Sequence, residues 1–197
     1  MYSKPDIYVT KTEQFTPQQE RILAIIAGLK RKIPMVIGGG ASLALQDIVV
    51  NDEDGEPMKV ADIDVITSQE GAYALNRILR PLELKQVEFG VKDPFNSHFG
   101  VFSNDGAVLE VMGDLAVRVS GSDADGTWHS YEHRLENPKM VNYKGLIVPV
   151  SSLDDQFISY LRLDRPKDRR KIEAIAEHLA KGNGTELSPM TYTFGRN

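Results

Sequence analysis

The chain has 197 residues, of which 41% are hydrophobic and 26% are charged, as in an ordinary soluble globular protein. The net charge of −5 excludes a basic scaffold that coats nucleic acid, and the lack of cysteine excludes disulfides, a thiolate nucleophile and cysteine-ligated zinc. Residues 1–15 lack the apolar stretch of a signal peptide, and no apolar run approaches the ~20 residues that span a bilayer. We expect a cytoplasmic protein, without a membrane partner, that folds as a single domain.

The first part of the chain alternates between helical and strand patterns. Thr16, Pro17 and Gln19 provide the cap, first-turn proline and capping box of a helix whose apolar residues recur at helical spacing. Residues 34–40 predict a short buried strand that runs into three glycines, and a helix opens directly after them. Residues 49–60 predict a loop or hairpin, because a polar centre with glycine and proline separates β-branched ends.

The middle of the chain predicts four strands and one helix. Residues 61–67 predict a strand, and residues 69–82 predict a helix that Pro81 ends. Runs of apolar and β-branched residues predict three further strands, at 85–90, 98–103 and 107–113.

The last part of the chain ends in helices. Residues 128–134 predict a strand inside a polar stretch, and residues 144–150 predict another. Ser152 caps a helix, and Pro166 opens a second helix that Gly182 ends. The order of elements predicts an α+β fold with a mixed β-sheet, flanking helices and a helical C-terminus. We place the core at about 17–150, the C-terminal helices at about 151–182 and a tail at 183–197.

Two carboxylates lie unusually close in the strand at 61–67. Asp62 and Asp64 are two residues apart, so their side chains point to the same face of the strand. Neighbouring carboxylates repel, and one takes up a proton unless a cation lies between them. Mg²⁺ fits, because it prefers oxygen and binds one or two protein carboxylates together with substrate phosphates. A solvent-facing strand surface that merely tolerates aspartate is the alternative.

Three glycines, Gly38 to Gly40, separate a predicted strand from a predicted helix. They allow the backbone to approach a bulky group, the free N–H groups suit an anion, and Ser42 adds a hydroxyl. A tight turn that requires positive φ is the alternative. The pattern is not a P-loop, because no Gly-Lys-Ser/Thr follows, and the dinucleotide GxGxxG spacing fails at Leu43.

Glu110 is a third candidate, because it lies in another apolar strand, between Leu109 and Val111. If this strand lies beside the strand of Asp62 and Asp64, Glu110 completes a cluster of three carboxylates. Such a cluster holds two metal ions, one for the attacking oxygen and one for the phosphates.

The glycine pair after a strand, the Asp-Ile-Asp sequence in a strand and the acid in a later strand resemble the DNA polymerase β-type nucleotidyltransferase superfamily. The chain is most similar to its small bacterial branch, which includes the abortive-infection-type and the aminoglycoside or lincosamide nucleotidyltransferases. In that branch an Arg-Pro-Lys-Asp segment often opens a helix, as Arg165 to Asp168 do here. The resemblance covers about residues 20–180 and rests on four short motifs.

The resemblance implies that the protein transfers a nucleoside monophosphate from a nucleoside triphosphate to a hydroxyl of an unknown acceptor, which is RNA, a protein or a small molecule. It implies that Asp62 and Asp64 bind two Mg²⁺ ions, with Mn²⁺ as an alternative metal. Glu110 then binds one of these ions and helps to activate the acceptor hydroxyl. The residues implied to hold the triphosphate are Gly38, Gly39 and Ser42.

The resemblance also implies a set of cations near the phosphates. Arg165 or Lys167 neutralises phosphate charge, and Asp168 orients the lysine. Lys59 and Arg118 are weaker candidates for the same role.

The sequence departs from the branch in two places. Residues 49–60 lengthen the gap between the glycines and the aspartate pair, which makes this segment an insertion or hairpin. Many relatives have a lysine shortly before the Arg-Pro-Lys-Asp segment, where residues 157–164 contain only Arg162 as a basic residue. This second departure motivates an alternative function, a non-catalytic nucleotide-binding or interaction module, toxin–antitoxin-like, on the same fold.

Two further patterns have structural explanations that we prefer. Residues 121–132 nearly match an EF-hand loop, but Gly121 occupies the first ligand position and the flanks are not helical in pattern, so we expect a polar turn. His129 and His133 are four residues apart without an evident third metal ligand, so we expect surface histidines.

Overall fold

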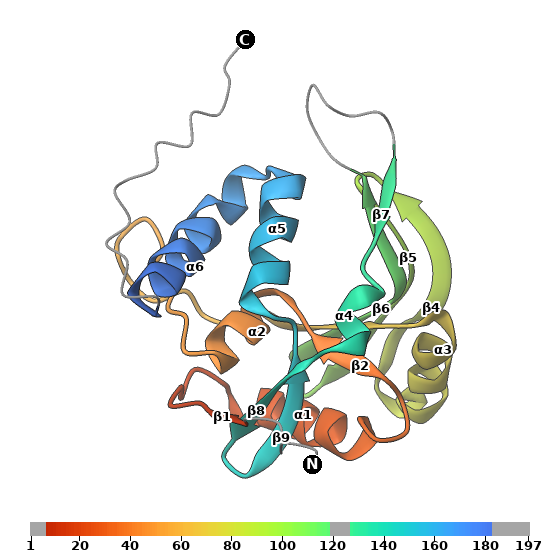
Figure 1. Ribbon diagram of the computed structural model, residues 1–197. Helices are drawn as coiled ribbons and strands as arrows, with labels where there is room; N and C mark the ends of the chain where they lie inside the picture. The colour runs from red at the N-terminus through yellow and green to blue at the C-terminus, as the bar shows by residue number, and fades with distance from the viewer. Residues whose placement is uncertain (1–6, 119–126, 183–197) are drawn as a thin grey trace, which may run out of the picture.

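The computed structural model describes residues 7–118 and 127–182, and a mixed sheet of nine strands forms the centre of this part (Figure 1). The spatial order is β1-β8-β9-β2-β3-β6-β5-β4, and β7 pairs with β6. The strands are β1 (Tyr8–Val9), β2 (Met35–Ile37), β3 (Asp62–Thr67), β4 (Glu83–Lys92), β5 (Phe95–Asn104), β6 (Ala107–Arg118), β7 (Trp128–Ser130), β8 (Lys139–Tyr143) and β9 (Leu146–Val150).

Helices pack on both faces of this sheet. The helix α1 contacts β5, β6 and β9, and α3 contacts β4, β5 and β6, whereas α2 contacts β3, α4 contacts β2, and α5 contacts β6 and α6. The helices are α1 (Pro17–Leu29), α2 (Gly39–Leu45), α3 (Gln69–Ile78), α4 (His133–Glu136), α5 (Leu153–Leu163) and α6 (Arg169–Gly182), with 3-10 turns at Arg80–Leu82 and Pro166–Asp168. The predicted α+β class, with a mixed sheet and a helical C-terminus, is confirmed.

The predicted caps set the helix starts. Thr16 Oγ1 accepts a hydrogen bond from Gln19 N at 3.2 Å, and the Gln19 side chain accepts one from Thr16 N at 2.9 Å, which completes the capping box of α1. Ser152 likewise accepts from Asp155 N at 3.1 Å and caps α5. Local hydrogen bonding therefore fixes where both helices begin.

Several elements differ from the sequence prediction. The strand predicted at 128–134 ends at Ser130, and Arg134 instead lies in the short helix α4. The strands β1 and β8 were not predicted, and β8 pairs with both β9 and β1. Pairing with these neighbours makes residues 139–143 a strand, because their sequence shows no clear alternation.

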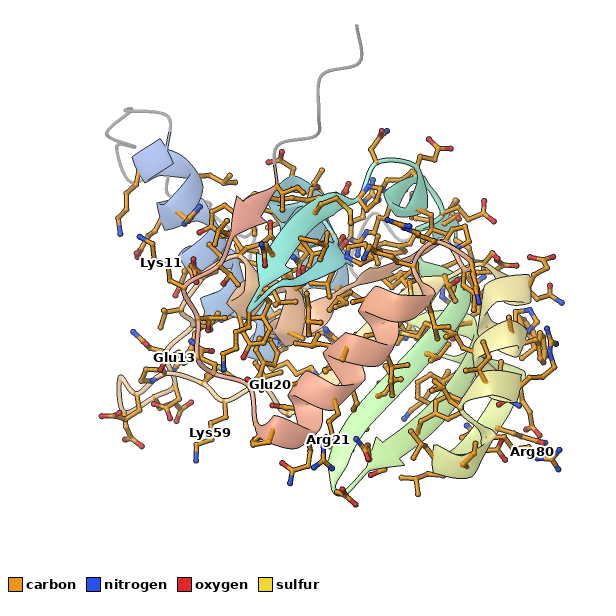
Figure 2. All side chains as sticks on the ribbon, turned by 90° about the horizontal axis from the view of Figure 1, so that it is seen from below. Lys11, Glu13, Glu20, Arg21, Lys59 and Arg80 are labelled. Carbon is orange, nitrogen blue, oxygen red and sulfur yellow. The ribbon has the colours of Figure 1, made fainter. Side chains whose placement is uncertain are left out.

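The helix α1 is fastened to the sheet on the side seen in Figure 2. Glu20 accepts hydrogen bonds from the Tyr143 hydroxyl and from Lys144 Nζ, both at 2.6 Å, and thereby reaches the β8–β9 turn. Arg21 forms an ion pair with Asp105, in the β5–β6 turn, at 2.9 Å. These contacts involve ends of strands and leave the opposite face of the sheet free for the site described next.

Residues 49–60 form a loop closed by a single antiparallel bridge between Asn51 and Pro57, as the predicted loop or hairpin requires. Within the described ranges, none of the helices combines the length and the apolar character needed to cross a membrane.

Candidate active site

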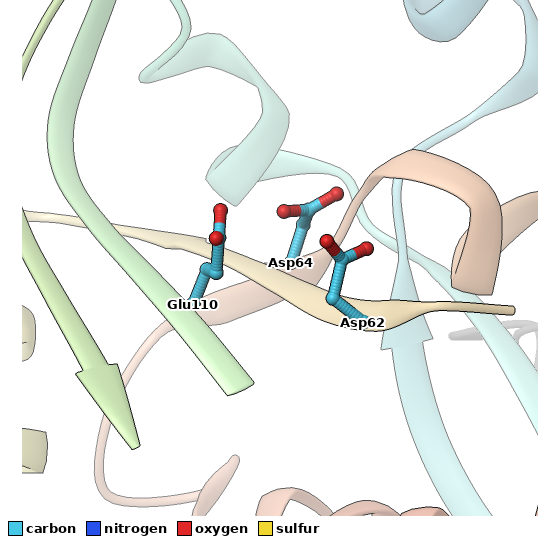
Figure 3. Close-up of side chains that lie close together, drawn as sticks. All are labelled: Asp62, Asp64 and Glu110. Carbon is cyan, nitrogen blue, oxygen red and sulfur yellow. The ribbon is translucent and has the colours of Figure 1, made fainter. Parts of the chain in front are cut away.

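The strands β3 and β6 are parallel neighbours, and Asp64 and Glu110 are directly opposite each other in their register. Asp62 lies two residues before Asp64 on the same face, so three carboxylates converge (Figure 3). One carboxylate oxygen from each residue lies within 4.8 Å of the other two. The side chains of Ile63 and Val65 point to the other face and are fully buried in the core.

The electrostatics of this cluster disfavour its fully ionised form. Burial, followed by the carboxylates of Asp62 and Glu110, raises the pKa of Asp64 to about 7. Burial, followed by the carboxylate of Asp62, also raises the pKa of Glu110. None of the ion pairs formed by residues 7–118 and 127–182 involves these three carboxylates. Their charge is therefore not neutralised by direct ion pairing within the described part of the protein.

The donor set suits a hard divalent cation. Three half-buried carboxylates offer oxygen ligands at a spacing that one or two ions of the Mg²⁺ type bridge. A cation at this position relieves the repulsion that raises the pKa of Asp64. The residues present thus fit the divalent metal that the sequence predicts, although the same residues also accept Mn²⁺.

The glycine segment packs directly against this cluster. Gly39 has φ of +58°, and a Cβ at this position would overlap Oδ2 of Asp64. Gly38 N donates a hydrogen bond to the Asp64 backbone oxygen at 2.8 Å. Two requirements, positive φ and close approach to a carboxylate, therefore restrict position 39 to glycine.

A cavity of about 810 Å³ opens over the three carboxylates. Gly38, Gly39 and Gly40 form part of its lining, and strands β4 and β5 and helices α5 and α6 supply further lining residues. Its cationic lining residues are Lys59, Lys85, Lys92, Arg134, Arg165, Lys167 and Lys171. The cavity therefore combines a cluster of carboxylates with a surrounding group of cations, which suits a metal-bound polyphosphate.

Asp168 organises the cations at the start of α6. This fully buried carboxylate accepts a hydrogen bond from Arg165 Nε at 2.5 Å, and its Oδ1 lies 3.6 Å from Lys171 Nζ. The positive charges of Lys171 and Arg165 partly offset the rise in the pKa of Asp64. The charge of Lys167 partly offsets the rise in the pKa of Glu110. The prediction that Asp168 orients Lys167 is corrected here, because its ion-pair partners are Arg165 and Lys171.

Lys171 is a site residue that the sequence analysis missed. The lysine expected before the Arg-Pro-Lys-Asp segment is absent, but Lys171 lies one helical turn after it and lines the cavity. Its i,i+3 spacing from Asp168 was the available signal, since an acid and a base so spaced share a helix face. The cation that the sequence seemed to lack is therefore supplied from α6.

Ser42 lies in the protein interior, whereas the sequence predicted that it contacts the triphosphate. Its side chain is fully buried and is not part of the cavity lining. Its Oγ accepts hydrogen bonds from Gln156 Nε2 at 2.9 Å and from Gln46 Nε2 at 3.2 Å, and it lies 3.3 Å from the Ser151 carbonyl oxygen. Its hydroxyl thus ties α2 to the β9–α5 junction, and this geometry does not support the predicted contact with phosphate.

Of the weaker cationic candidates, Lys59 lines the cavity whereas Arg118 does not. Arg118 pairs with Asp93 at 2.5 Å and stacks over the Trp128 ring. Lys85, Lys92 and Arg134 are further lining cations that the sequence analysis missed, and Arg134 was missed because residue 134 was assigned to a strand. It is 6% exposed, its Nη2 donates to the Asp155 backbone oxygen at 2.8 Å, and it stacks on Tyr131.

The first half of the predicted polar turn at 121–132 lies outside the described residues, and the second half contains the strand β7. His129 lies in β7 and His133 begins α4, where its Nε2 is 3.3 Å from Asp155 Oδ1. Neither histidine belongs to a metal-ligating cluster among the residues described.

The mixed sheet, the carboxylates on its parallel strands and the glycine segment beside them define a nucleotidyltransferase of the expected superfamily branch. The sequence profile of the aminoglycoside-2''-adenylyltransferase family matches residues 21–175, and the chain belongs to this family.

Solved structures agree with this assignment. A protein from Thermotoga maritima, described as a candidate nucleotidyltransferase, is 32% identical, with a TM-score of 0.64, and the alignment covers 87% of this chain and 97% of that one. The lincosamide antibiotic adenylyltransferase LnuA, solved with lincomycin bound, shares the fold at 13% identity and a TM-score of 0.50, over 80% of this chain and 96% of that one. No curated protein matches the chain.

Proposed function

We propose that the protein is a metal-dependent nucleotidyltransferase that moves a nucleoside monophosphate from a nucleoside triphosphate to an acceptor hydroxyl. The observation that carries this proposal is the cluster of Asp62, Asp64 and Glu110, which faces a cavity with cations along its lining. ATP is the first donor to test, since the matched family and LnuA are both adenylyltransferases.

In this reaction the acceptor oxygen forms a bond to the α-phosphorus, the bond from that phosphorus to the oxygen bridging it to the β-phosphorus breaks, and pyrophosphate leaves. Asp62, Asp64 and Glu110 would hold the divalent ions, which neutralise charge on the phosphate oxygens. Glu110 takes the hydroxyl proton, because its carboxylate lines the cavity beside Asp62 and Asp64.

The cations near Asp64 suit the leaving pyrophosphate. Arg165 and Lys171 lie close enough to Asp64 to offset part of the rise in its pKa. Asp168 forms ion pairs with both cations. Their positive charge stabilises the negative charge that the leaving group gains, without any reorganisation during the reaction. Gly38 and Gly39 let the donor approach Asp64, because no side chain intervenes there.

Calorimetric titration with ATP, GTP, CTP and UTP, each with and without Mg²⁺, tests the proposal. We expect one nucleotide to bind with micromolar affinity only when Mg²⁺ is present, and we expect Asp62→Asn and Asp64→Asn to lose this binding. Asp54→Asn is the matched control, because Asp54 is exposed in the 49–60 loop and does not line the cavity. Binding of no nucleotide to the wild type would contradict the proposal.

The alternative function, a module that binds nucleotide without transferring it, rests on the missing lysine before Arg165. The position of Lys171 weakens this argument, because it supplies a cation to the same cavity. Release of pyrophosphate from bound ATP separates the two functions, since only the enzyme releases it.

A further inference from the structure

One edge of the sheet ends in a regular stretch of strand that carries exposed apolar residues. The strand β4 is the last in the spatial order and pairs with β5 alone among the described strands (Figure 1). Its register with β5 is shifted twice before Glu88 and is uninterrupted from Glu88 to Lys92. Within this stretch, which we call the β4 edge (residues 88–92), Phe89 and Val91 are 61% and 62% exposed.

The backbone of the β4 edge has hydrogen-bonding groups that point away from the sheet. The Pro94 oxygen accepts a hydrogen bond from Arg118 N of β6 at 2.8 Å, so the even-numbered residues at this end of β5 bond to β6 and the odd-numbered ones bond to β4. Their register partners in β4 are the even-numbered residues of 88–92. The backbone groups of Phe89 and Val91 therefore point outward, and no other described segment bonds to them.

The side chains of the β4 edge alternate between two faces of the sheet. The rings of Phe89 and His98 lie 5.2 Å apart, and His98 in turn contacts α3, so Phe89 and Val91 lie on the α3 face. Glu88 and Lys92 lie on the other face and line the cavity. Among the described residues, neither of these two charged side chains forms an ion pair.

The sequence of the β4 edge is complementary to itself when two copies run antiparallel. A two-fold axis at Gly90 places Phe89 opposite Val91 of the second copy and Glu88 opposite Lys92 of the second copy. Each contact occurs twice, because the two copies are related by symmetry. Phe89 and Val91 then exchange backbone hydrogen bonds with the second copy, as their outward-pointing groups require. Apolar side chains meet on one face and opposite charges meet on the other.

Gly90 supports this register. A Cβ at position 90 would meet no described atom within 4 Å, and the φ of Gly90 is not positive, so the fold of one copy does not require glycine there. A glycine inside a strand weakens that strand but allows another backbone to approach closely. On the two-fold axis Gly90 faces Gly90 of the second copy, where such an approach takes place.

We propose that the β4 edge is a homodimer interface, at which a second copy of this chain extends the sheet by antiparallel pairing about Gly90. Lys92 of the second copy then neutralises Glu88, so each copy braces the hairpin that lines the cavity of the other. We expect a dissociation constant in the micromolar range, because a pairing of five residues buries a small area. This proposal does not depend on the proposed nucleotidyl transfer.

Sedimentation velocity of the full chain at increasing concentration tests the proposal. We expect the wild type to change from monomer to dimer through the micromolar range. Glu88→Lys and Lys92→Glu should each weaken the dimer at least about ten-fold, because like charges then face each other in both pairs. An equimolar mixture of the two variants should form a heterodimer, because opposite charges face each other again. Glu83→Lys is the matched control, since Glu83 is exposed at the other end of β4.

Amide hydrogen exchange locates the contact. The amides of Phe89 and Val91 should exchange more slowly as the concentration rises, whereas the amide of Gly90, which bonds to β5 within one copy, should not change. A wild type that stays monomeric at hundreds of micromolar overturns the proposal, as does a mixture of the two charge variants that associates no more tightly than each alone. A dimer in which exchange at Phe89 and Val91 is unchanged also overturns it.

Discussion

Two acidic regions contribute to the candidate site, one that lines the cavity and one buried beside its lining cations, and they differ in their counterions. Asp168, at the start of α6, is fully buried and has Arg165 and Lys171 as ion-pair partners. Asp62, Asp64 and Glu110, on the sheet, have no ion-pair partner among the described residues, and they repel one another. The protein thus supplies the counterions of Asp168 itself, whereas no described residue forms an ion pair with the three carboxylates on the sheet. This difference supports the proposed role of these three carboxylates as a metal site.

The largest expected effect is on catalysis. Asp62→Asn should lower the rate of transfer at least about 1,000-fold, because a lost metal ligand removes several kcal/mol of transition-state stabilisation. Pyrophosphate release from Mg·ATP measures this rate, with the acceptor or with water as the nucleophile. The comparison fails if Asp168→Asn lowers the rate about 1,000-fold while Asp62→Asn leaves the rate unchanged.

The next effect is on folding, and it belongs to Asp168. Asp168→Asn should lower the free energy of unfolding by about 3 kcal/mol, because it leaves two cations without their buried counterion. Urea denaturation measures the change, and Asp154→Asn, at an exposed position in the first turn of α5, serves as the control. An unchanged midpoint would show that this region is not structural.

Asp64 should show a stability effect of opposite sign. Its pKa is raised to about 7, so the favourable contribution of its protonated form is full below about pH 4 and is lost as the pH rises through about 7. Without metal, Asp64→Asn should therefore be more stable than the wild type at pH 8 by roughly 1–3 kcal/mol, after allowance for partial exposure.

The difference in stability between Asp64→Asn and the wild type should vanish near pH 4, and added Mg²⁺ should stabilise only the wild type. Thermal unfolding at several pH values measures both effects. A variant that is less stable than the wild type at pH 8 would refute the proposed repulsion.

Ser42 should show the smallest effect. Ser42→Ala should cost about 1 kcal/mol of stability, because it removes hydrogen bonds that join α2 to the β9–α5 junction. Nucleotide affinity should stay within about twofold of the wild type. If affinity instead falls ten-fold at unchanged stability, Ser42 contacts phosphate, as the sequence predicted.

The sequence predicts the carboxylates more reliably than the residues around them. Asp62 and Asp64 are visible because a strand has a period of two, and Glu110 because it interrupts an apolar run. Arg134 reaches the cavity only through α4, which no local pattern reveals, whereas its i,i+3 spacing from Asp168 was a local signal for Lys171. Ser42 was assigned to phosphate because its distance from the glycines does not show which face of α2 is buried.

The strands show the same limit of local information. β3 and β6 have strong apolar patterns and were predicted, whereas β8 depends on its pairing with β9. The ends of β4, β5 and β6 also lie beyond their predicted bounds, because pairing with neighbouring strands extends each of them. Pairing with neighbouring strands, rather than the strand propensity of the residues, therefore determines that β8 forms and where β4, β5 and β6 end.

The most direct test of the central claim is a titration with Mn²⁺ followed by electron paramagnetic resonance, on the wild type, Asp62→Asn and Asp168→Asn. The account predicts that the wild type binds Mn²⁺ more tightly when ATP is present. It also predicts that Asp62→Asn loses this binding and that folded Asp168→Asn retains the metal site. Equal Mn²⁺ binding by the wild type and Asp62→Asn, or none by either, would contradict the claim that these carboxylates form a metal site.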